Sequence, residues 1–296
     1  MQSRKNFYKA FEDKYRGSRD VIKSRLKVYL PFVERLHALG SFQAIDLGCG
    51  RGEWLELLQE MKCSAIGIDL DEGMLEDCKL KKLNVKHQDV LEALVNLEDD
   101  SMSIVSGFHI VEHLTFDELQ KIVTESLRVL IPGGLLILET PNPENIRVGT
   151  EYFYDDATHI RPIPANLLSF IPEHYGFERV KVLKLQEPQA LHTKDHVTLS
   201  DVFWGVSPDY CVIAQKKATS EVLEKFDDLF FKTYGITLDD ILNKFENRLS
   251  YYEEKVKQLE QSNQEAWKHY FLMTNSVSWK ITRPLRLLKK VLFMKK

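Results

Sequence analysis

Short apolar runs alternate with helical patterns between residues 43 and 141 of this 296-residue chain. The runs QAIDL, SAIGIDL, SIVSGF and GLLILET, with NVKHQD as a shorter third strand, are separated by stretches whose apolar residues recur at helical spacing. Strands that alternate with helices pair in parallel through right-handed crossovers. Two later runs, FERVKVLKLQE and DYCVIAQKK, suit an edge hairpin that completes the sheet. The pattern predicts an α/β fold with an open, doubly wound sheet of seven strands.

The composition predicts four segments along the chain. They are a helical segment (1–40), the α/β domain (41–217), a helical and coiled-coil region (218–278) and a basic amphipathic tail (279–296). Two series of residues recur every seven positions from 238 to 277: Leu242, Leu249, Val256, Asn263, Tyr270 and Val277, and Leu238, Phe245, Tyr252, Leu259, Ala266 and Met273. These are a and d positions of a left-handed coiled coil, and Asn263 favours a parallel dimer. We therefore expect a homo-oligomer; the alternative is a helix packed on its own domain.

The tail interleaves Lys and Arg with apolar residues, and no acidic residue follows Glu265. Such a segment can lie in a membrane interface with its cations near anionic headgroups, or dock on a partner protein. No run approaches the roughly 20 apolar residues that cross a bilayer. A charged N-terminus, four cysteines without a CxxC pair and a net charge of −4 predict a cytoplasmic protein that does not bind duplex nucleic acid. Peripheral contact with the cytoplasmic face of the inner membrane is the expectation for the tail.

The stretch IDLGCGRGEW (45–54) predicts a ligand-binding loop between a strand and a helix. Its glycines let the backbone approach a ligand, and the helix start offers free N–H groups. The spacing differs from the G-x-G-x-x-G of dinucleotide sites, and Asp46 would repel a pyrophosphate. Asp69 ends the next strand and suits ribose hydroxyls, and Asp89 follows the third strand and suits an adenine amine. Three carboxylates around one glycine loop favour a nucleoside that carries a positive charge.

This arrangement resembles the class I methyltransferases, whose fold is Rossmann-like and whose cofactor is S-adenosylmethionine. The resemblance covers about residues 40–216 through DLGCGRG, GIDLDEGM, QDV and LRVLIPGGLLILETPNP. It implies that Asp46, Gly48 and Gly50 hold the methionine end, with the backbone near His109 beside it. It also implies that Asp69 binds the ribose, that Leu70 packs on the adenine, and that Asp89 and Val90 meet the adenine edge.

The run SGFHIVEHL (106–114) follows the fourth strand, at the edge of the sheet where ligands bind. Three interpretations stay open. His113 or His159, with Glu112 beside the substrate, acts as a general base toward a hydroxyl. Alternatively His109, Glu112, His113 and His159 bind a divalent metal, as in the E-x-x-E-H run of metal-dependent O-methyltransferases, although His109 replaces the first glutamate. In the third, Glu112 and His113 simply begin a helix. A metal is not the expectation.

Other segments, ETPNPENIRVGTEYFYDDATHIRPIP and SVSWKITRPLR among them, resemble methyltransferases of bacterial O-antigen and surface-polysaccharide clusters, of the chain-terminating type but without kinase motifs. The resemblance implies a glycan acceptor, methylation of the terminal sugar of a lipid-linked polymer, and contact with a polymerase or glycosyltransferase complex. A helix over 238–277 would be about 60 Å long and would limit chain length as a ruler. The alternatives are a metal-dependent small-molecule or RNA O-methyltransferase, an NAD-dependent sugar oxidoreductase and a non-catalytic scaffold.

Overall fold

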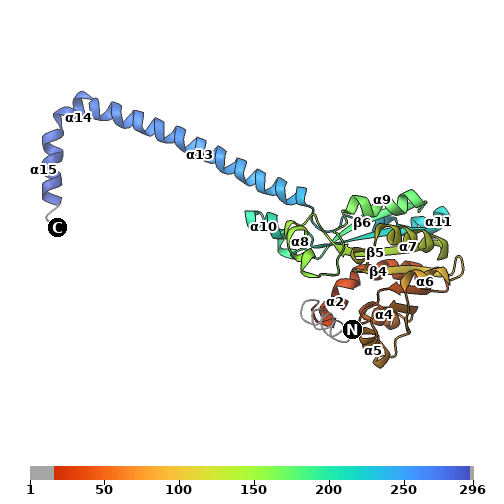
Figure 1. The fold of residues 1–296 in the computed structure, drawn as a ribbon. Coiled ribbons are helices and arrows are strands. Elements are labelled where there is room, and N and C mark those ends of the chain that lie inside the picture. Colours follow the sequence, from red (N-terminus) through yellow and green to blue (C-terminus); the bar gives the residue numbers. More distant parts are fainter. Residues whose placement is uncertain (1–16, 294–296) are drawn as a thin grey trace. The chain divides into compact units, whose positions relative to one another are not determined.

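The structure, a computed structural model, describes residues 17–293 and divides into two compact units, with the division between Ile241 and Leu242. The first unit contains a seven-stranded sheet in the order β3-β2-β1-β4-β5-β7-β6 (Figure 1). Its strands are β1 (Gln43–Leu47), β2 (Ser64–Asp69), β3 (Val85–His87), β4 (Met102–Phe108), β5 (Leu130–Pro141), β6 (Arg179–Leu185) and β7 (Asp209–Gln215). All neighbours from β3 to β5 pair in parallel, and β7 runs antiparallel between β5 and β6. The predicted seven-stranded α/β sheet is confirmed, including the edge pair.

Helices cover both faces of this sheet (Figure 1). The first unit contains α2 (Arg19–Leu26), α3 (Leu30–His37), α4 (Glu53–Glu60), α5 (Glu72–Leu80), α6 (Val90–Val95), α7 (Phe116–Val129), α8 (Ile146–Thr150), α9 (Ala165–Tyr175), α10 (Leu199–Trp204), α11 (Ser220–Glu224) and α12 (Asp227–Phe231). Short 3-10 helices are η1 (Lys27–Tyr29), η2 (Val111–His113), η3 (Tyr152–Asp155) and η4 (Gln189–Leu191). Successive side chains of a strand point to opposite faces, so Leu135 and Ile137 pack with α2, α3, α4 and α12, whereas Leu136 and Leu138 pack with α6, α7 and α9.

The helical segment before β1 is part of the core of the first unit. Tyr29, Phe32 and Val33 are fully buried in the cluster that covers one face of the sheet. On the same face Phe226 is buried in a turn that follows the predicted boundary at 217/218. The compact unit therefore extends to Ile241, beyond both predicted boundaries of the α/β domain, because apolar side chains on either side of 41–217 complete its core.

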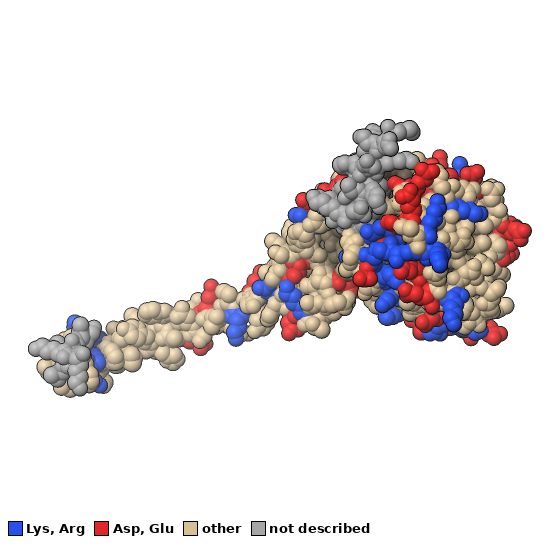
Figure 2. All heavy atoms as spheres, turned by 90° about the horizontal axis from the view of Figure 1, so that it is seen from below, with Lys and Arg blue, Asp and Glu red and all other residues tan. Residues whose placement is uncertain are grey.

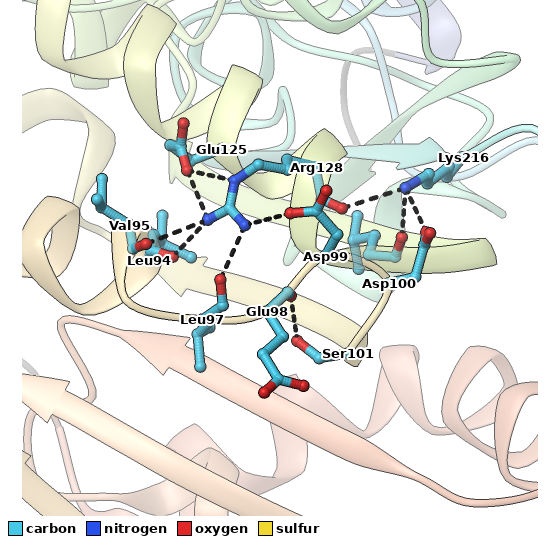
Figure 3. Close-up of polar contacts among 11 residues, drawn as sticks. Leu94, Val95, Leu97, Glu98, Asp99, Asp100, Ser101, Glu125, Arg128 and Lys216 are labelled. Carbon is cyan, nitrogen blue, oxygen red and sulfur yellow. Dashed lines mark hydrogen bonds and ion pairs between the residues drawn. The ribbon is translucent and has the colours of Figure 1, made fainter.

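Arg128, in the last turn of α7, ties that helix to the loop between α6 and β4 (Figure 3). Its guanidinium pairs with the carboxylates of Glu125 and Asp99 at 2.7 Å each. It also donates to the carbonyl oxygens of Leu97 at 2.8 Å and Leu94 at 3.0 Å, which lie at and beyond the C-terminal end of α6. Carbonyls at a helix end have no partner within the helix, so one cation satisfies several acceptors at once. This contact fixes how α6 and α7 cover the sheet.

The second unit consists of helices. The 38-residue α13 (Leu238–Asn275) begins in the first unit and is followed by α14 (Val277–Ile281) and α15 (Arg283–Phe293). Ser276 interrupts the helix, since its backbone is extended and its hydroxyl accepts the N–H of Trp279 at 3.2 Å. The predicted heptad position Val277 therefore lies outside the continuous helix. Leu249, Val256 and Leu259 are about half exposed or more, and self-association through them stays a prediction.

Charge is mixed on the first unit. On the face that Figure 2 shows, Lys and Arg side chains are interspersed with Asp and Glu, whereas α13 toward its C-terminal end is mostly uncharged. Within residues 17–293, no helix combines the length and the apolar character needed to cross a bilayer.

Candidate functional site

A cavity of about 980 Å³ opens at the carboxyl edge of the parallel strands. Parallel strands all end at the same edge of the sheet, so Asp46, Asp69 and Phe108, at or near the ends of their strands, line one cavity. Every residue predicted to bind the cofactor lines this cavity: Asp46, Gly48, Gly50, Asp69, Leu70, Asp89, Val90 and His109. Ile22 and Arg25 of α2 also line it. A role for this helix in the site was not predicted from the sequence.

The loop after β1 has a backbone that only glycine adopts easily. Gly48 and Gly50 have φ of 66° and 51°, in the left-handed region. A Cβ at Gly48 would lie 3.1 Å from Cδ1 of Ile110, so the loop packs closely against the residues that follow β4. Asp46 is 2% exposed, and Ser106 donates to its Oδ1 at 2.7 Å. The loop is a cradle in which a side chain would intrude, with a buried carboxylate beside it, and this fits a cationic ligand.

Asp69 holds the loop as well as facing the cavity. Its Oδ2 accepts the N–H of Gly50 at 2.8 Å, and its Oδ1 accepts the N–H of Asp71 at 2.8 Å. Each carboxylate oxygen has two lone-pair sites, so both retain the capacity to accept a hydroxyl. Leu70 is 60% exposed at the rim, as an apolar surface for a planar ring. The predicted ribose and adenine roles stay proposals that this placement supports.

Asp89 caps α6 and lines the cavity. Its Oδ1 accepts the N–H groups of Leu91 at 2.9 Å and Glu92 at 3.1 Å. The helix start therefore engages one oxygen, and Oδ2 is the atom that suits an adenine amine. Val90 is buried directly behind it and lines the cavity.

His109 lies among three carboxylates. Its backbone has φ of 57°, and its N–H donates to the carbonyl oxygen of Glu139 at 2.9 Å. Its Nδ1 lies 3.2 Å from Glu112 Oε1, and its Nε2 lies 3.5 Å from Glu139 Oε1 and 3.9 Å from Asp209 Oδ1. Burial alone would lower the pKa of His109, but the adjacent carboxylates of Glu112 and Glu139 and the charge of Asp209 hold it well above the usual value. A non-glycine residue in this backbone region is strained, as is frequent at functional sites.

Sequence reasoning missed Glu139 and Asp209. Tyr29 donates its hydroxyl proton to Oε2 of Glu139, and burial raises the pKa of Asp209 to about 6 although His109 opposes the shift. Pro141 at the end of β5 pairs with Asp209 at the start of β7. Because β7 is antiparallel, its first residue lies at the edge where the parallel strands end. The predicted edge hairpin could have identified Asp209, because an acid at the start of an antiparallel strand next to β5 lies at the edge of the sheet that forms the site.

His159 and His113 both present a lone pair on Nε2 in their neutral forms. The Nδ1 of His159 lies 2.6 Å from the carbonyl oxygen of Phe153, which can only accept, so Nδ1 carries the proton. The hydroxyl of Thr158 donates to Asp156 Oδ1 at 2.6 Å, so it must accept from His113 Nδ1, 3.0 Å away. Burial lowers the pKa of His113, and the nearby His159 acts in the same direction. The two rings, 4.8 Å apart, form a pair of bases.

The predicted four-residue metal set is divided between two groups. Ligand atoms of Glu112, His113 and His159 lie within 4.8 Å of one another, whereas His109 groups with Glu139 and Asp209. Glu112 is fully buried, its Oε2 accepts the hydroxyl of Thr140 at 2.9 Å, and its Oε1 lies 4.0 Å from His159 Nε2. His109 is held by carboxylates and has a raised pKa, which disfavours it as a metal ligand.

Glu112 and His113 do not begin the following helix. They lie in η2, and Leu114 is extended before Thr115 starts α7 with a capping box to Glu118. The interpretation of these residues as a mere helix start is therefore wrong.

Comparisons with known proteins agree with this geometry. A family model described as "Methyltransferase domain" matches residues 45–138. A probable S-adenosylmethionine-dependent methyltransferase of Mycolicibacterium smegmatis is 30% identical over 144 residues, which cover 48% of this chain and 54% of that protein. A ubiquinone biosynthesis O-methyltransferase of Methylococcus capsulatus is 28% identical over 152 residues, covering 45% of this chain and 63% of that protein. The chain thus spans less than two thirds of the length of these curated relatives.

A solved structure gives the fuller match. The crystal structure of a SAM-dependent methyltransferase from Archaeoglobus fulgidus is 32% identical, with a TM-score of 0.63, and the match covers 71% of this chain and 100% of that one. The NAD-dependent oxidoreductase and scaffold alternatives find no support in these comparisons, because the family model and the relatives named above are methyltransferases. The chain belongs to the S-adenosylmethionine-dependent methyltransferase family, and the cavity at the edge of its sheet fits the cofactor of that family.

Proposed function

We propose that this enzyme methylates a hydroxyl group of a sugar, namely the terminal sugar of a lipid-linked bacterial surface polysaccharide. The observation that carries the proposal is that two imidazole bases, His113 and His159, line the same cavity as the residues predicted to hold the cofactor, with the buried carboxylate of Glu112 beside them. A hydroxyl is a weak nucleophile until a base takes its proton. The assignment to a surface polysaccharide rests on the sequence resemblance of residues 139–164 and 276–286.

The site residues divide the chemistry between them. When bound, S-adenosylmethionine supplies a methyl group on a positively charged sulfur, and Asp46, Gly48 and Asp69 are the residues that would hold it. His159 Nε2 takes the proton of the acceptor hydroxyl while the oxygen of that hydroxyl gains the methyl group. The resulting imidazolium lies 4.0 Å from Glu112 Oε1 and 3.9 Å from Asp156 Oδ2, and these carboxylates stabilise its charge.

A metal-dependent O-methyltransferase is the second candidate. The ligand atoms of Glu112, His113 and His159 are close enough to one another to hold one ion, and two bare imidazole nitrogens with one carboxylate suit Zn²⁺, Mn²⁺ or Fe²⁺ better than Mg²⁺. A bound cation would lower the pKa of the acceptor hydroxyl. Under this candidate the histidines are ligands, and the acceptor is a small molecule or RNA.

One assay separates the candidates. Radiolabelled methyl transfer is measured with unmethylated surface glycan, with small RNA and with a catechol, each with and without EDTA. We expect transfer to the glycan that EDTA leaves unchanged, a large loss in His159→Ala, and full activity in the control His174→Ala, whose exposed ring lies on α9. Transfer to RNA or catechol that EDTA abolishes would instead establish the metal-dependent candidate.

We also propose that α13 joins copies of the chain and sets the reach of the enzyme. A 38-residue helix is about 57 Å long, and its exposed face carries Leu249, Val256, Leu259 and Met273. Sedimentation of the full chain tests the dimer, and Leu249→Lys with Val256→Lys should give monomers. Deleting two heptads should change the polymer length on a gel, and unchanged lengths would contradict the ruler.

For α14 and α15 we propose peripheral contact with an anionic membrane surface. Lys280, Arg283 and Lys289 are exposed beside Ile281 and Leu285, which are 72% and 68% exposed. Apolar and cationic groups together match acyl chains and anionic headgroups. Cosedimentation with phosphatidylglycerol vesicles but not with phosphatidylcholine vesicles is the expected result. Equal binding to both, or to neither, would favour a protein partner such as the polymerase complex.

A further inference from the structure

Two exposed aromatic side chains and an arginine form a small surface that the methyl-transfer chemistry does not use. The guanidinium of Arg147 lies 4.1 Å from the centre of the Trp204 ring and 5.2 Å from that of Tyr152. The two rings are 5.9 Å apart. Tyr152 is nevertheless 45% exposed and Trp204 48% exposed. We call these three residues the aromatic platform. Contiguous apolar side chains that stay open to water beside polar groups mark candidate binding sites.

The platform is held rigidly by the backbone around it. Asn145 caps α8 by accepting the N–H of Arg147 at 3.1 Å. The Asn145 amide group donates to the carbonyl oxygen of Val206 at 2.6 Å, just beyond the end of α10. This buried amide joins the helix that carries Arg147 to the helix that carries Trp204, and Figure 1 shows α8 and α10 side by side. A surface fixed before binding loses little entropy when a ligand arrives.

The platform continues into the cavity of the methyl-transfer site. Tyr152 lines that cavity, as does Asp155 at the end of the same 3-10 helix. Phe153, which follows Tyr152, is buried, and the centre of its ring lies 4.6 Å from that of His159, the proposed base. Tyr152, Phe153 and the base His159 therefore belong to one segment, residues 152–159, in which the buried Phe153 ring packs against the base. A ligand with one end at His159 would extend over Tyr152.

We infer that the aromatic platform is a subsite for a second sugar ring of the acceptor, next to the ring that is methylated. A pyranose presents a face of C–H groups surrounded by hydroxyls. Aromatic rings cover such a face, while Arg147 donates to hydroxyls and Asp155 accepts from them. A purely apolar partner would leave these charged groups desolvated without compensation. The inference rests on the proposed glycan acceptor and adds that the enzyme binds at least two sugar rings of it.

The test compares acceptors of different length. Unmethylated fragments of one, two and three sugars are prepared by acid hydrolysis of surface glycan from cells that lack the gene, and kcat/KM is measured for each. Trp204→Leu keeps an apolar side chain but removes the aromatic face, and Trp204→Phe keeps a ring. Phe170→Leu is the matched control, because Phe170 is an exposed aromatic residue on α9 outside the cavity lining.

We expect kcat/KM for two or three sugars to fall about tenfold more in Trp204→Leu than kcat/KM for one sugar. Trp204→Phe should restore most of the loss, and Phe170→Leu should leave the ratio unchanged. Equal losses for all acceptor lengths would overturn the subsite. If wild type methylates no glycan, the proposed function fails, and saturation-transfer NMR with S-adenosylhomocysteine present decides the subsite. Binding of the trisaccharide that Trp204→Leu abolishes would support it, and absent or unaltered binding would overturn it.

Discussion

Oε1 of Glu112 lies 3.2 Å from Nδ1 of His109, and the Glu112 side chain is fully buried. A buried carboxylate is costly unless a charge or hydrogen bonds compensate it, and here an imidazole does so. Burial would raise the pKa of Glu112, but the adjacent, charged His109 lowers it overall. The pair is therefore carboxylate and imidazolium near neutral pH. It places a fixed negative charge at 4.0 Å from Nε2 of the proposed base His159.

We predict that His109 stays protonated well above pH 6.5, because three carboxylates face it. Its folded pKa exceeds the unfolded value, so its contribution to stability is complete below about pH 6.5 and is lost as pH rises through the folded pKa. Imidazole ¹⁵N shifts at pH 7.5 should show an imidazolium for His109 and a neutral ring for His113. A neutral His109 at that pH would contradict the charge assignment.

Replacing Glu112 with Gln should slow methyl transfer while leaving cofactor affinity almost unchanged. The amide removes the charge that stabilises protonated His159 and holds His109 protonated, so we expect kcat to fall by about a hundredfold. The NMR shifts should show the pKa of His109 moving toward its usual value. Glu173→Gln, at an exposed position of α9, is the control. Wild-type kcat in Glu112→Gln would exclude the carboxylate from the chemistry.

Cofactor binding should depend on Asp69 more than on Asp89. Asp69 holds the N–H of Gly50 in the loop and faces the cavity, whereas Asp89 already uses one oxygen as a helix cap. Calorimetry with S-adenosylhomocysteine should show at least about hundredfold weaker binding for Asp69→Ala and about tenfold for Asp89→Asn. The exposed Asp117→Asn should bind like wild type. Unchanged affinity in Asp69→Ala would mean that the ribose is held elsewhere.

Because of Asp209, the stability of the folded protein should change with pH in the mildly acidic range. Burial raises its folded pKa to about 6, above its model-peptide value near 4, so the folded state binds the proton more tightly than the unfolded state. Its contribution to stability is therefore lost as pH rises from about 4 to about 6. The Tm of Asp209→Asn relative to wild type should increase between pH 4.5 and pH 7. A constant difference across that window would show that Asp209 does not titrate there.

Arg128→Ala should destabilise the first unit without touching the site. The guanidinium satisfies two carbonyls at and beyond the C-terminal end of α6 and two carboxylates (Figure 3), and the loss of these contacts should lower the free energy of unfolding by about 2 kcal/mol. Arg128→Lys should recover part of it, since an ammonium cannot reach all four acceptors. Denaturant unfolding measures the effect, with the exposed Lys121→Ala as control. Equal stability of Arg128→Ala and wild type would show that water replaces these contacts.

The strands and the cofactor loop could be predicted from sequence because their signals are local. β1 was predicted at its observed bounds, since a short apolar run that is followed directly by glycines is typical of a buried strand that ends in a turn. Glu139 and Asp209 were missed because their role arises from an antiparallel pairing across about 70 residues of chain. The tautomers of His113 and His159 depend on Thr158 and the Phe153 carbonyl, which no spacing rule relates to them. The burial of Tyr29 beside Glu139 likewise needed the packed fold.

Mass spectrometry of surface glycan tests the central claim most directly. Cells that lack the gene are complemented with wild type, with His159→Ala or with the control His174→Ala, and the end groups of the polymer are compared. The account predicts an O-methylated terminal sugar with wild type and the control, and its loss in the deletion and in His159→Ala. Identical glycan masses in the deletion and the wild-type strain would contradict the assignment of a sugar hydroxyl as the methyl acceptor.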